Sequence, residues 1–450
     1  MKSALALAAA LLAALAVLLI LLAGHTDERH AEAPPLVLGA PAGPAIKIGP
    51  GVVGLSIEYQ LLARELGASR CPPIALLRAI KGLGSPAIRI GGDSQDETAP
   101  SGTPPHPGVS DLPVGFWARL GCLERETSVP VVVGLNLASG EPAWAATVAA
   151  DARAVIPPSR LRFELGNEPD IYGGHVPWWN GTRLVHGPMP FPTYLARARE
   201  LAAAIGRGSQ IEGPDFASGR WIKELPALAH ALGFSAFDAH YYPLDACRSD
   251  AGDSAAALLS RDIQVKLNER VRIAREAHAA GLPALISETN SISCGGVAGI
   301  SDSPAAAVWA VRLLLTALRD GFGSVRFHAS GGAYDPFVID GAALTTRPIY
   351  LGLQLASEVL APGAALRAIP SARALAGVAV SAKTSTTYIL SNYTAAALAV
   401  ALPAGRGVRA AAVRARAPTL RQWNPRSGAG RVRVSLPPNS VVAITAPAPG

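Results

Sequence analysis

Two glutamates close short apolar segments that are typical of β-strands. Glu168 ends the segment 161–168, and Glu288 lies near the end of the segment 284–290. A carboxylate beside a packed core costs stability, because its charge must be desolvated. Two carboxylates on converging strands can cleave a glycosidic bond, one acting as acid/base and the other as nucleophile. A single strand-end glutamate is more often a salt-bridge partner or a helix cap, but two of them favour catalysis.

Other polar residues follow the remaining strand-like segments, and a ring of such residues suits a sugar. The ring comprises Glu58, Asp93, Asn136, Asn167, Asp215, His240, Tyr241, Tyr242 and His328. We expect Glu58 to accept hydrogen bonds from sugar hydroxyls, and Asp93 to do the same or to cap a helix. A donor such as the Tyr241 hydroxyl is expected to keep Glu288 ionised. Glu164 lies in mid-strand and is predicted to make a buried structural contact.

Strand-like segments alternate with helical patterns from about residue 50 onward. The eight predicted strands comprise residues 52–58, 87–92, 129–137, 161–168, 211–216, 236–242, 284–290 and 324–329. The predicted helices include residues 74–80, 143–155, 194–205, 262–280 and 305–318. Eight strands, each followed by a helix, predict an α/β fold of the (β/α)8 TIM-barrel type. In such barrels the chemistry gathers at the carboxyl ends of the strands.

An open doubly wound sheet is the alternative that this alternation also allows. That fold would place a glycine-rich phosphate-binding loop after its first strand. The first strand here ends in Glu58-Tyr59-Gln60 instead. The barrel is therefore favoured, and residues 50–360 are predicted to form the catalytic domain.

The end of the chain has a different texture. Residues 361–450 carry short β-rich runs that are separated by turns containing proline, glycine or asparagine. This pattern is typical of a small β-sandwich. We expect a C-terminal β-sandwich domain, to which residues 35–49 add strands.

Residues 1–33 resemble a targeting segment. Lys2 precedes an apolar run from Ala4 to Ala23, and Ala31-Glu32-Ala33 matches a signal-peptide cleavage motif. About 20 apolar residues can also span a bilayer as a retained anchor. The sequence therefore predicts export, to a periplasmic or extracellular location, and leaves open whether the segment is cleaved or anchors the protein.

The composition favours a compact globular protein. Half of the 450 residues are hydrophobic, only 16% are charged, and the net charge is +7. A positive charge attracts anionic partners. We find no dense cluster of lysine and arginine with interleaved aromatic residues, so nucleic-acid binding is not expected.

The four cysteines predict two disulfides, because an exported chain enters an oxidising compartment. Four cysteines allow three pairings. Cys247 and Cys294 follow the sixth and seventh predicted strands, and Cys71 and Cys122 lie near the first two helices. This layout favours the pairs Cys71–Cys122 and Cys247–Cys294. The spacing matches no metal-ligand pattern, so zinc is not expected.

Four segments together resemble glycoside hydrolase family 79, the family of β-glucuronidases and heparanase. They are Phe163-Glu164-Leu165-Gly166-Asn167-Glu168-Pro169, Ile286-Ser287-Glu288-Thr289-Asn290, Ile88-Arg89-Ile90-Gly91-Gly92-Asp93 and Asp238-Ala239-His240-Tyr241-Tyr242. The Asn-Glu pair alone is similar to a wider clan of retaining (β/α)8 hydrolases, whereas the combination indicates the family. The resemblance covers nearly all of the chain after the N-terminal segment.

The resemblance implies that Glu168 is the general acid/base and Glu288 the nucleophile. An acid that is protonated near neutral pH needs a raised pKa, which burial or the nearby Glu288 charge would supply. The resemblance also implies that Asn167 hydrogen-bonds the sugar 2-OH. Glu58 matches the acidic residue of the family's first strand.

In that family a glycine pair and a tyrosine hold the substrate carboxylate. Gly295 and Gly296, after the nucleophile strand, and Tyr334, after the eighth strand, match these places. Backbone N–H groups at glycine can approach an anion closely. Each glycine is also a common turn residue.

These observations predict a retaining glycoside hydrolase that cleaves β-linked glucuronic acid from glycans or glycosides without metal or cofactor. One alternative is a clan relative that cleaves neutral sugars. Another is a non-catalytic carbohydrate-binding protein on the same scaffold. The membrane is expected to be a partner only through an uncleaved N-terminal segment.

Overall fold

The computed structural model describes residues 35–447, apart from 105–107, 248–253, 264–266, 373, 404–406, 426 and 429–430. The predicted targeting segment, residues 1–33, lies outside the described residues. Within the described ranges, no helix is both long and apolar enough to cross a bilayer.

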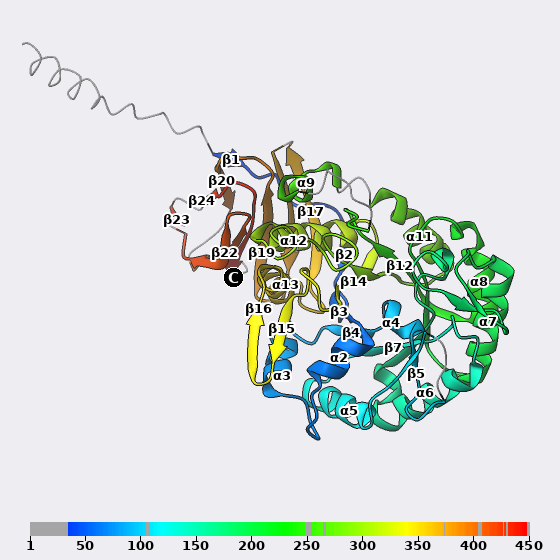
Figure 1. Ribbon diagram of the computed structural model, residues 1–450. Helices are drawn as coiled ribbons and strands as arrows, with labels where there is room; N and C mark the ends of the chain where they lie inside the picture. The colour runs from blue at the N-terminus through cyan, green and yellow to red at the C-terminus, as the bar shows by residue number, and fades with distance from the viewer. Residues whose placement is uncertain are drawn as a thin grey trace, which may run out of the picture.

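Eight parallel strands close into a barrel, which confirms the predicted fold class (Figure 1). In chain order they are β3 (Val53–Ile57), β4 (Ala87–Ile90), β7 (Val131–Leu135), β8 (Leu161–Leu165), β11 (Ile211–Phe216), β12 (Phe234–Tyr241), β13 (Ala284–Thr289) and β14 (Phe322–Ala329). The ring closes where β14 pairs with β3 in parallel. Almost every strand residue is buried, as parallel strands covered by helices on their outer side must be.

Helices surround the barrel on the outside (Figure 1). Their bounds are α2 (Tyr59–Glu65), α3 (Ile74–Lys81), α4 (Asp93–Asp96), α5 (Phe116–Thr127), α6 (Pro142–Val155), α7 (Phe191–Ala204), α8 (Leu225–Leu232), α9 (Ala255–Leu259), α11 (Asn268–Ala279), α12 (Pro304–Arg319) and α13 (Pro348–Val359). Helix α7 begins three residues before the predicted start, because Pro192 in its first turn needs no N–H partner. Within the predicted helix 262–280, residues 262–263 are helical, a turn stands at Leu267, and α11 begins at Asn268.

The C-terminal strands form two sheets that pack as a β-sandwich. The seven-stranded sheet comprises β2 (Ala42–Lys47), β17 (Ala365–Ala372), β18 (Leu375–Ser381), β19 (Ser385–Asn392), β25 (Ser440–Pro447), β21 (Arg409–Arg414) and β22 (Ala417–Trp423). The four-stranded sheet comprises β1 (Leu36–Val37), β20 (Leu398–Pro403), β24 (Arg431–Leu436) and β23 (Ser427–Gly428). Alternating apolar residues such as Val432 and Val434 fill the space between the sheets, opposite Val442 and Ile444.

Both predicted disulfides are confirmed. Cys71 pairs with Cys122, and Cys247 with Cys294, at Cα separations of 5.4 and 5.5 Å. The second pair joins the loops that follow β12 and β13. It therefore ties together two loops at the end of the barrel where the candidate site lies.

Candidate active site

The two candidate catalytic glutamates face each other at the carboxyl ends of the barrel strands. Glu288 lies in β13, and Glu168 follows β8 in a left-handed backbone conformation with φ 52°. One ring nitrogen of His240, Nδ1, lies 2.8 Å from Glu168 Oε1 and 3.8 Å from Glu288 Oε1. A carboxylate oxygen of Glu168 lies within 4.8 Å of one of Glu288. The strands thus bring together residues that are 120 positions apart in the sequence.

Positive and hydrogen-bonding groups surround the Glu288 carboxylate. Arg89 Nη1 donates to Glu288 Oε2 over 2.7 Å, and the Tyr242 hydroxyl donates to Oε1 over 2.8 Å. His328 Nδ1 lies 3.5 Å from Oε2. Burial alone would raise the pKa of Glu288, but the charges of His328, His240 and Arg89 outweigh it and lower the pKa to about 2. Glu288 is therefore ionised, as a nucleophile must be.

The hydroxyl that donates to Glu288 belongs to Tyr242, the residue next to the predicted donor Tyr241. Tyr241 was expected to donate to this carboxylate, but its hydroxyl points outward and donates to the Ile263 carbonyl over 2.8 Å. Successive residues of a strand point to opposite sides, so Tyr242 reaches the site and Tyr241 does not. The prediction that Tyr241 binds substrate is wrong, because its side chain is buried and does not line the cavity.

Two histidines contact the Glu168 carboxylate. His240 Nδ1 binds Oε1, and His175 Nε2 lies 3.3 Å from Oε2. Burial raises the pKa of Glu168, but the hydrogen bonds and charges of the two histidines outweigh it and hold the pKa below its usual range. The expectation of a raised pKa is wrong for the free protein, because no local sequence pattern indicates that His175 contacts this carboxylate.

The histidines hold the protons instead. Burial lowers the pKa of His175, but hydrogen bonds to Asp93 and Glu168 raise it to about 10. The pKa of His240 is also raised well above its ordinary value, against the effect of burial, by the charges of Glu288 and its other carboxylate neighbours. Glu168, His175 and His240 therefore share protons as one coupled group.

Arg89 is the hub of a buried polar network beneath the two glutamates. Besides Glu288, its fully buried guanidinium contacts Glu164 over 2.6 Å and Asn167 Oδ1 over 3.0 Å. Asn167 Nδ2 in turn donates to Asp93 Oδ1 over 3.0 Å. Glu164 is completely buried in this network, as its mid-strand position predicts. The contact of Asn167 with a sugar 2-OH stays a prediction.

A cavity of about 930 Å³ opens above the network. The two catalytic candidates, Glu168 and Glu288, line this cavity. Glu58, Asp93 and Tyr334 line it as well. Glu58 accepts hydrogen bonds from the Ser94 amide over 2.9 Å and from His328 Nε2 over 3.2 Å, so one of its oxygens is fixed on each side. Asp93 opens the short helix α4 and points to His175, 3.0 Å away.

The loops expected to hold a substrate carboxylate are partly occupied by their own hydrogen bonds. The amides of Gly331 and Gly332 both donate to Asp335, and the Gly296 amide donates to the Ser293 carbonyl. Gly296 also does not line the cavity, so its predicted contact with an anion is not favoured. Gly295 does line the cavity, with φ 83°, and its amide donates to no described residue.

The Tyr334 hydroxyl is available as a second donor. Its oxygen accepts a hydrogen bond from Ser330 Oγ over 3.1 Å, which leaves its own proton for another acceptor. The Gly295 carbonyl accepts from the Ala333 amide over 2.6 Å, so the two loops hold each other. Gly295 and Tyr334 thus stand together at one end of the cavity.

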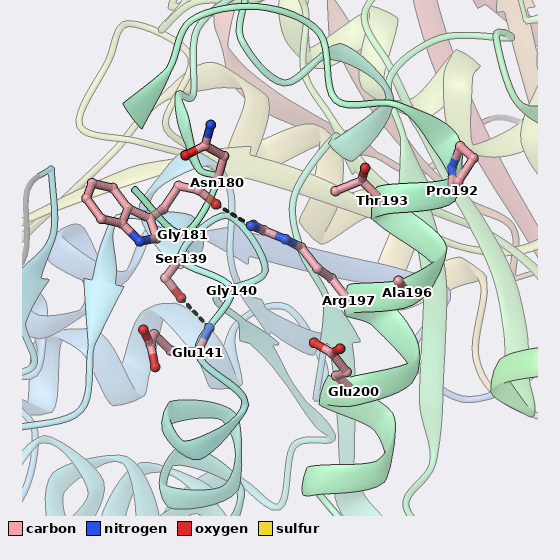
Figure 2. A pocket seen from close by; sticks show the side chains of 11 residues that line it. Ser139, Gly140, Glu141, Asn180, Gly181, Pro192, Thr193, Ala196, Arg197 and Glu200 are labelled. Atoms are coloured by element: carbon pink, nitrogen blue, oxygen red, sulfur yellow. Dashed lines mark hydrogen bonds between the residues drawn. The ribbon is translucent and has the colours of Figure 1, made fainter. Parts of the chain in front are cut away.

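A second hollow, of about 600 Å³, lies between the start of α6 and α7 (Figure 2). Arg197 and Glu200 of α7 face Glu141 and Asn180 across it (Figure 2). Arg197 Nη1 is held by the carbonyls of Leu137 and Ala138 at 3.1 and 3.0 Å. Neither catalytic candidate lines this hollow, so the carboxylate pair belongs to the cavity at the barrel mouth.

Three groups of side chains in the described part of the chain have the spacing of metal ligands. They are Asp93, Glu168 and His175; Glu168, His240 and Glu288; and Glu164, Glu212 and Asp238. Guanidinium groups already neutralise two of them, because Arg89 binds Glu288 and Arg326 binds Glu212 over 2.5 Å. These ligand sets fit a network of ion pairs better than a cation site.

Sequence reasoning did not assign roles to several residues of this site. Arg89, His240, Tyr242 and His328 were visible as strand residues, but their contacts depend on which side of the strand each faces. His175 lies in a loop and carries no strand signal at all. Only an alternation count along residues 236–242 could have selected Tyr242 over Tyr241.

Comparison with known proteins agrees with these observations. Residues of this chain match a β-glucuronidase from Neurospora crassa at 24% identity over 375 residues. The match covers 72% of this chain and 65% of that relative, so the chain spans about two thirds of the relative's length. No family model matches the sequence. The match agrees with the resemblance to glycoside hydrolase family 79 that the four segments indicate.

Solved structures confirm the fold over most of the chain. A 4-O-α-L-rhamnosyl-β-D-glucuronidase from Fusarium oxysporum superposes with a TM-score of 0.70 and 18% identity, covering 91% of this chain and 100% of its own. A family 51 α-L-arabinofuranosidase from Bifidobacterium longum gives a TM-score of 0.66 and 15% identity, with coverages of 91% and 99%. Because glycoside hydrolases with different sugars share this fold, the fold alone does not select the substrate.

Proposed function

We propose that this protein is a retaining glycoside hydrolase that releases β-linked glucuronic acid from glycans or glycosides. The observation that carries the proposal is the carboxylate spacing, since oxygens of Glu168 and Glu288 lie within 4.8 Å of each other. A retaining enzyme needs its carboxyl groups about 5–5.5 Å apart, whereas an inverting enzyme needs about 6.5–9.5 Å to admit a water between them.

The first step forms a covalent intermediate. A Glu288 oxygen attacks the anomeric carbon, the bond to the leaving oxygen breaks, and that oxygen takes a proton from Glu168. Tyr242 and Arg89 fix the Glu288 carboxylate from two sides, so that an oxygen is aimed into the cavity. This orientation lowers the activation free energy, because the reacting atoms are already positioned and lose little further entropy in the transition state.

The proton for the leaving group is supplied by the coupled group around Glu168. In the free protein it resides on His175 and His240, and Glu168 is ionised. As negative charge develops on the leaving oxygen, the proton passes through Glu168, which His175 can recharge across 3.3 Å. A carboxylate that starts ionised is therefore compatible with acid catalysis.

The second step uses the same residues in reverse. Glu168 accepts a proton from a water molecule, the water oxygen attacks the anomeric carbon, and the Glu288–sugar bond breaks. Once Glu288 carries the sugar it has no negative charge. The Glu288 charge that raised the pKa of His240 is then absent, so the pKa of His240 falls. The group formed by Glu168, His175 and His240 can then accept the proton from water.

The uronic acid assignment rests on the end of the cavity formed by Gly295 and Tyr334. A free backbone N–H and a phenolic O–H can both donate to a carboxylate. A neutral sugar presents a hydroxymethyl group there, which uses these two donors less well. The name of the Neurospora relative, a β-glucuronidase, supports the same choice.

Export of the enzyme is part of the proposal. Two disulfides are typical of proteins that leave the reducing cytosol. The N-terminal apolar segment points to the same destination. A polymeric or conjugated glucuronide outside the cell is therefore the expected substrate.

A chromogenic panel tests the proposal. Aryl β-glucuronide, β-glucoside, β-xyloside and α-arabinofuranoside are compared at one concentration, and the anomer first released is followed by NMR. We expect turnover of the glucuronide with the β-anomer appearing first. Faster turnover of a neutral glycoside, or first release of the α-anomer from the glucuronide, would contradict the sugar or the mechanism respectively.

A further inference from the structure

The C-terminal domain has a charge unlike that of the rest of the chain. Residues 361–450 contain 11 lysine and arginine residues and no aspartate or glutamate. Residues 1–360 hold the other 29 basic residues and all 33 acidic ones. The positive net charge of the protein therefore resides in its C-terminal fifth.

These basic side chains face solvent without acidic partners. In the part of the domain that the structure describes, seven are exposed and Arg414 is half-buried; the exposed ones are Arg367, Lys383, Arg409, Arg416, Arg421, Arg431 and Arg433. None of the eight forms an ion pair with another described residue. Uncompensated charges on one domain create a positive potential that attracts polyanions.

The same domain contains a cavity with the chemistry of a sugar-binding site. It has a volume of about 420 Å³ and lies between the end of α13 and strands β19, β21, β22 and β25. Its lining includes Arg409, Gln422, Trp423, Asn424, Thr387 and Glu358. The polar groups of this set are two amides, a hydroxyl, a carboxylate and one guanidinium.

The amides, the hydroxyl and the guanidinium of the lining suit an acidic sugar. Gln422 pairs with Ala411 across the strands and lies on the cavity face of the sheet, whereas Trp423 pairs with Ala410 and packs against the sandwich core on the other face. Amides and carboxylates bind sugar hydroxyls from both sides. The exposed Arg409 guanidinium can bind a carboxylate through two parallel hydrogen bonds.

The cavity lies at the end of the barrel opposite to the catalytic residues. The amide of Gly363, just after α13, donates to the Ile48 carbonyl over 2.8 Å, and Ile48 precedes the amino end of β3. Glu168 and Glu288 lie at the carboxyl ends of the strands. A polymer held at this cavity would therefore leave the catalytic mouth open.

We propose that this cavity, with Arg409 in its lining, binds an acidic polysaccharide without cleaving it. The site anchors the enzyme to a polymer whose chain ends reach the barrel mouth of the same or a neighbouring molecule. The choice of a uronate polymer as the ligand rests on the proposed function, whereas the cationic cavity itself does not. Arg409 supplies the charge contact, and Gln422, Asn424 and Thr387 supply hydrogen bonds to the sugar hydroxyls.

The test measures polymer binding separately from hydrolysis. The full chain carrying Glu288→Gln is titrated with β-linked polyglucuronate and with its carboxyl-reduced, neutral form at two salt concentrations. We expect the acidic polymer to bind more tightly, with an affinity that falls as salt rises. Arg409→Gln is expected to weaken binding about tenfold, as the loss of a charge-assisted hydrogen bond does. Gln422→Ala is expected to weaken it about fivefold, as the loss of a neutral hydrogen bond does.

Controls separate this site from the catalytic one. Arg275→Gln removes an equally exposed arginine from α11 and should leave polymer affinity unchanged. In the wild-type background, Arg409→Gln should turn over a small aryl β-glucuronide at the normal rate. If no glycoside is hydrolysed but the polymer still binds through Arg409, only the proposed function fails.

Three results would overturn the inference. Unchanged polymer affinity in both Arg409→Gln and Gln422→Ala, with folding checked by circular dichroism, would show that the polymer does not bind in this cavity. Equal affinity for the acidic and the carboxyl-reduced polymer would show that charge does not contribute to binding. Tighter binding to phosphatidylglycerol vesicles or to DNA than to polyglucuronate would assign the surface to lipid or nucleic acid instead.

Discussion

In the barrel the charged side chains that matter are buried and paired, whereas in the C-terminal β domain they are exposed and unpaired. Arg89, with no exposed surface, contacts Glu164 and Glu288 at 2.6 and 2.7 Å. Arg433, on the outer face of β24, has no ion-pair partner among the described residues. The same residue type therefore does different work in the two regions.

The difference follows from desolvation. A buried charge is costly unless partners compensate it, so the barrel interior can hold charges only as a complete network. Such a network fixes each group in one position and one protonation state, which catalysis requires. An exposed charge keeps its hydration, costs little, and attracts partners at long range. The barrel thus uses charge for chemistry and the β domain uses it for attraction.

The largest expected effect is the loss of the catalytic pair. Glu288→Gln and Glu168→Gln should each lower kcat/KM for an aryl β-glucuronide by about a thousandfold or more, since each removes a group that takes part in bond making or proton transfer. Steady-state kinetics measure the loss. Full activity in either variant would refute the role of that residue and would make the buried network merely structural.

A matched pair of arginine substitutions tests the comparison directly. Arg326→Met should lower the free energy of unfolding by about 3 kcal/mol or more, because Glu164 and Glu212 lose a buried partner. Arg433→Met should change it by less than about 0.5 kcal/mol, as exposed substitutions usually do. Urea denaturation measures both. Equal losses would show that burial does not separate the two regions.

His175 tests whether the network supplies the proton for the leaving group. His175→Gln should lower kcat for a glucuronide with a poor leaving group by about tenfold to a hundredfold, and much less for a dinitrophenyl glucuronide, which needs no acid. The His175 pKa of about 10 means that its proton is present below that pH and lost above it. The alkaline limb of the pH–rate profile should therefore move to lower pH in the variant.

The exposed His186, which also lies between β8 and α7, provides the control, because it makes no contact with Glu168. His186→Gln should leave both the leaving-group dependence and the pH profile as they are. An equal loss on both leaving groups in His175→Gln would mean that His175 only holds the loop in place.

The smallest expected effect concerns the sugar carboxylate. Tyr334→Phe removes one donor at the end of the cavity, so turnover of the glucuronide should fall about tenfold more than turnover of the matching glucoside. The comparison uses kcat/KM for the two substrates with one variant. Parallel losses on both would take Tyr334 out of carboxylate recognition and leave Gly295 as the remaining donor there.

The sequence by itself determined the strands, the two glutamates and the disulfides. Segments such as 161–168 and 284–290 are short and apolar, so their local sequence is enough to predict that they form strands. Cys247 and Cys294 follow adjacent strands, which made their pairing predictable once the barrel was inferred. Few folds bury the apolar faces of eight strands that alternate with helices, so the barrel could be predicted from the pattern.

Only the tertiary structure decided which side chains meet. Tyr242 reaches Glu288 and Tyr241 does not, since successive residues point to opposite sides and the closed barrel decides which side is the inner one. His175 reaches Glu168 through a loop whose path no local pattern records. That contact reversed the expected direction of the Glu168 pKa, because a pKa depends on neighbours in space. Identity and order of residues fix local structure, but electrostatics depends on distances that only the folded chain defines.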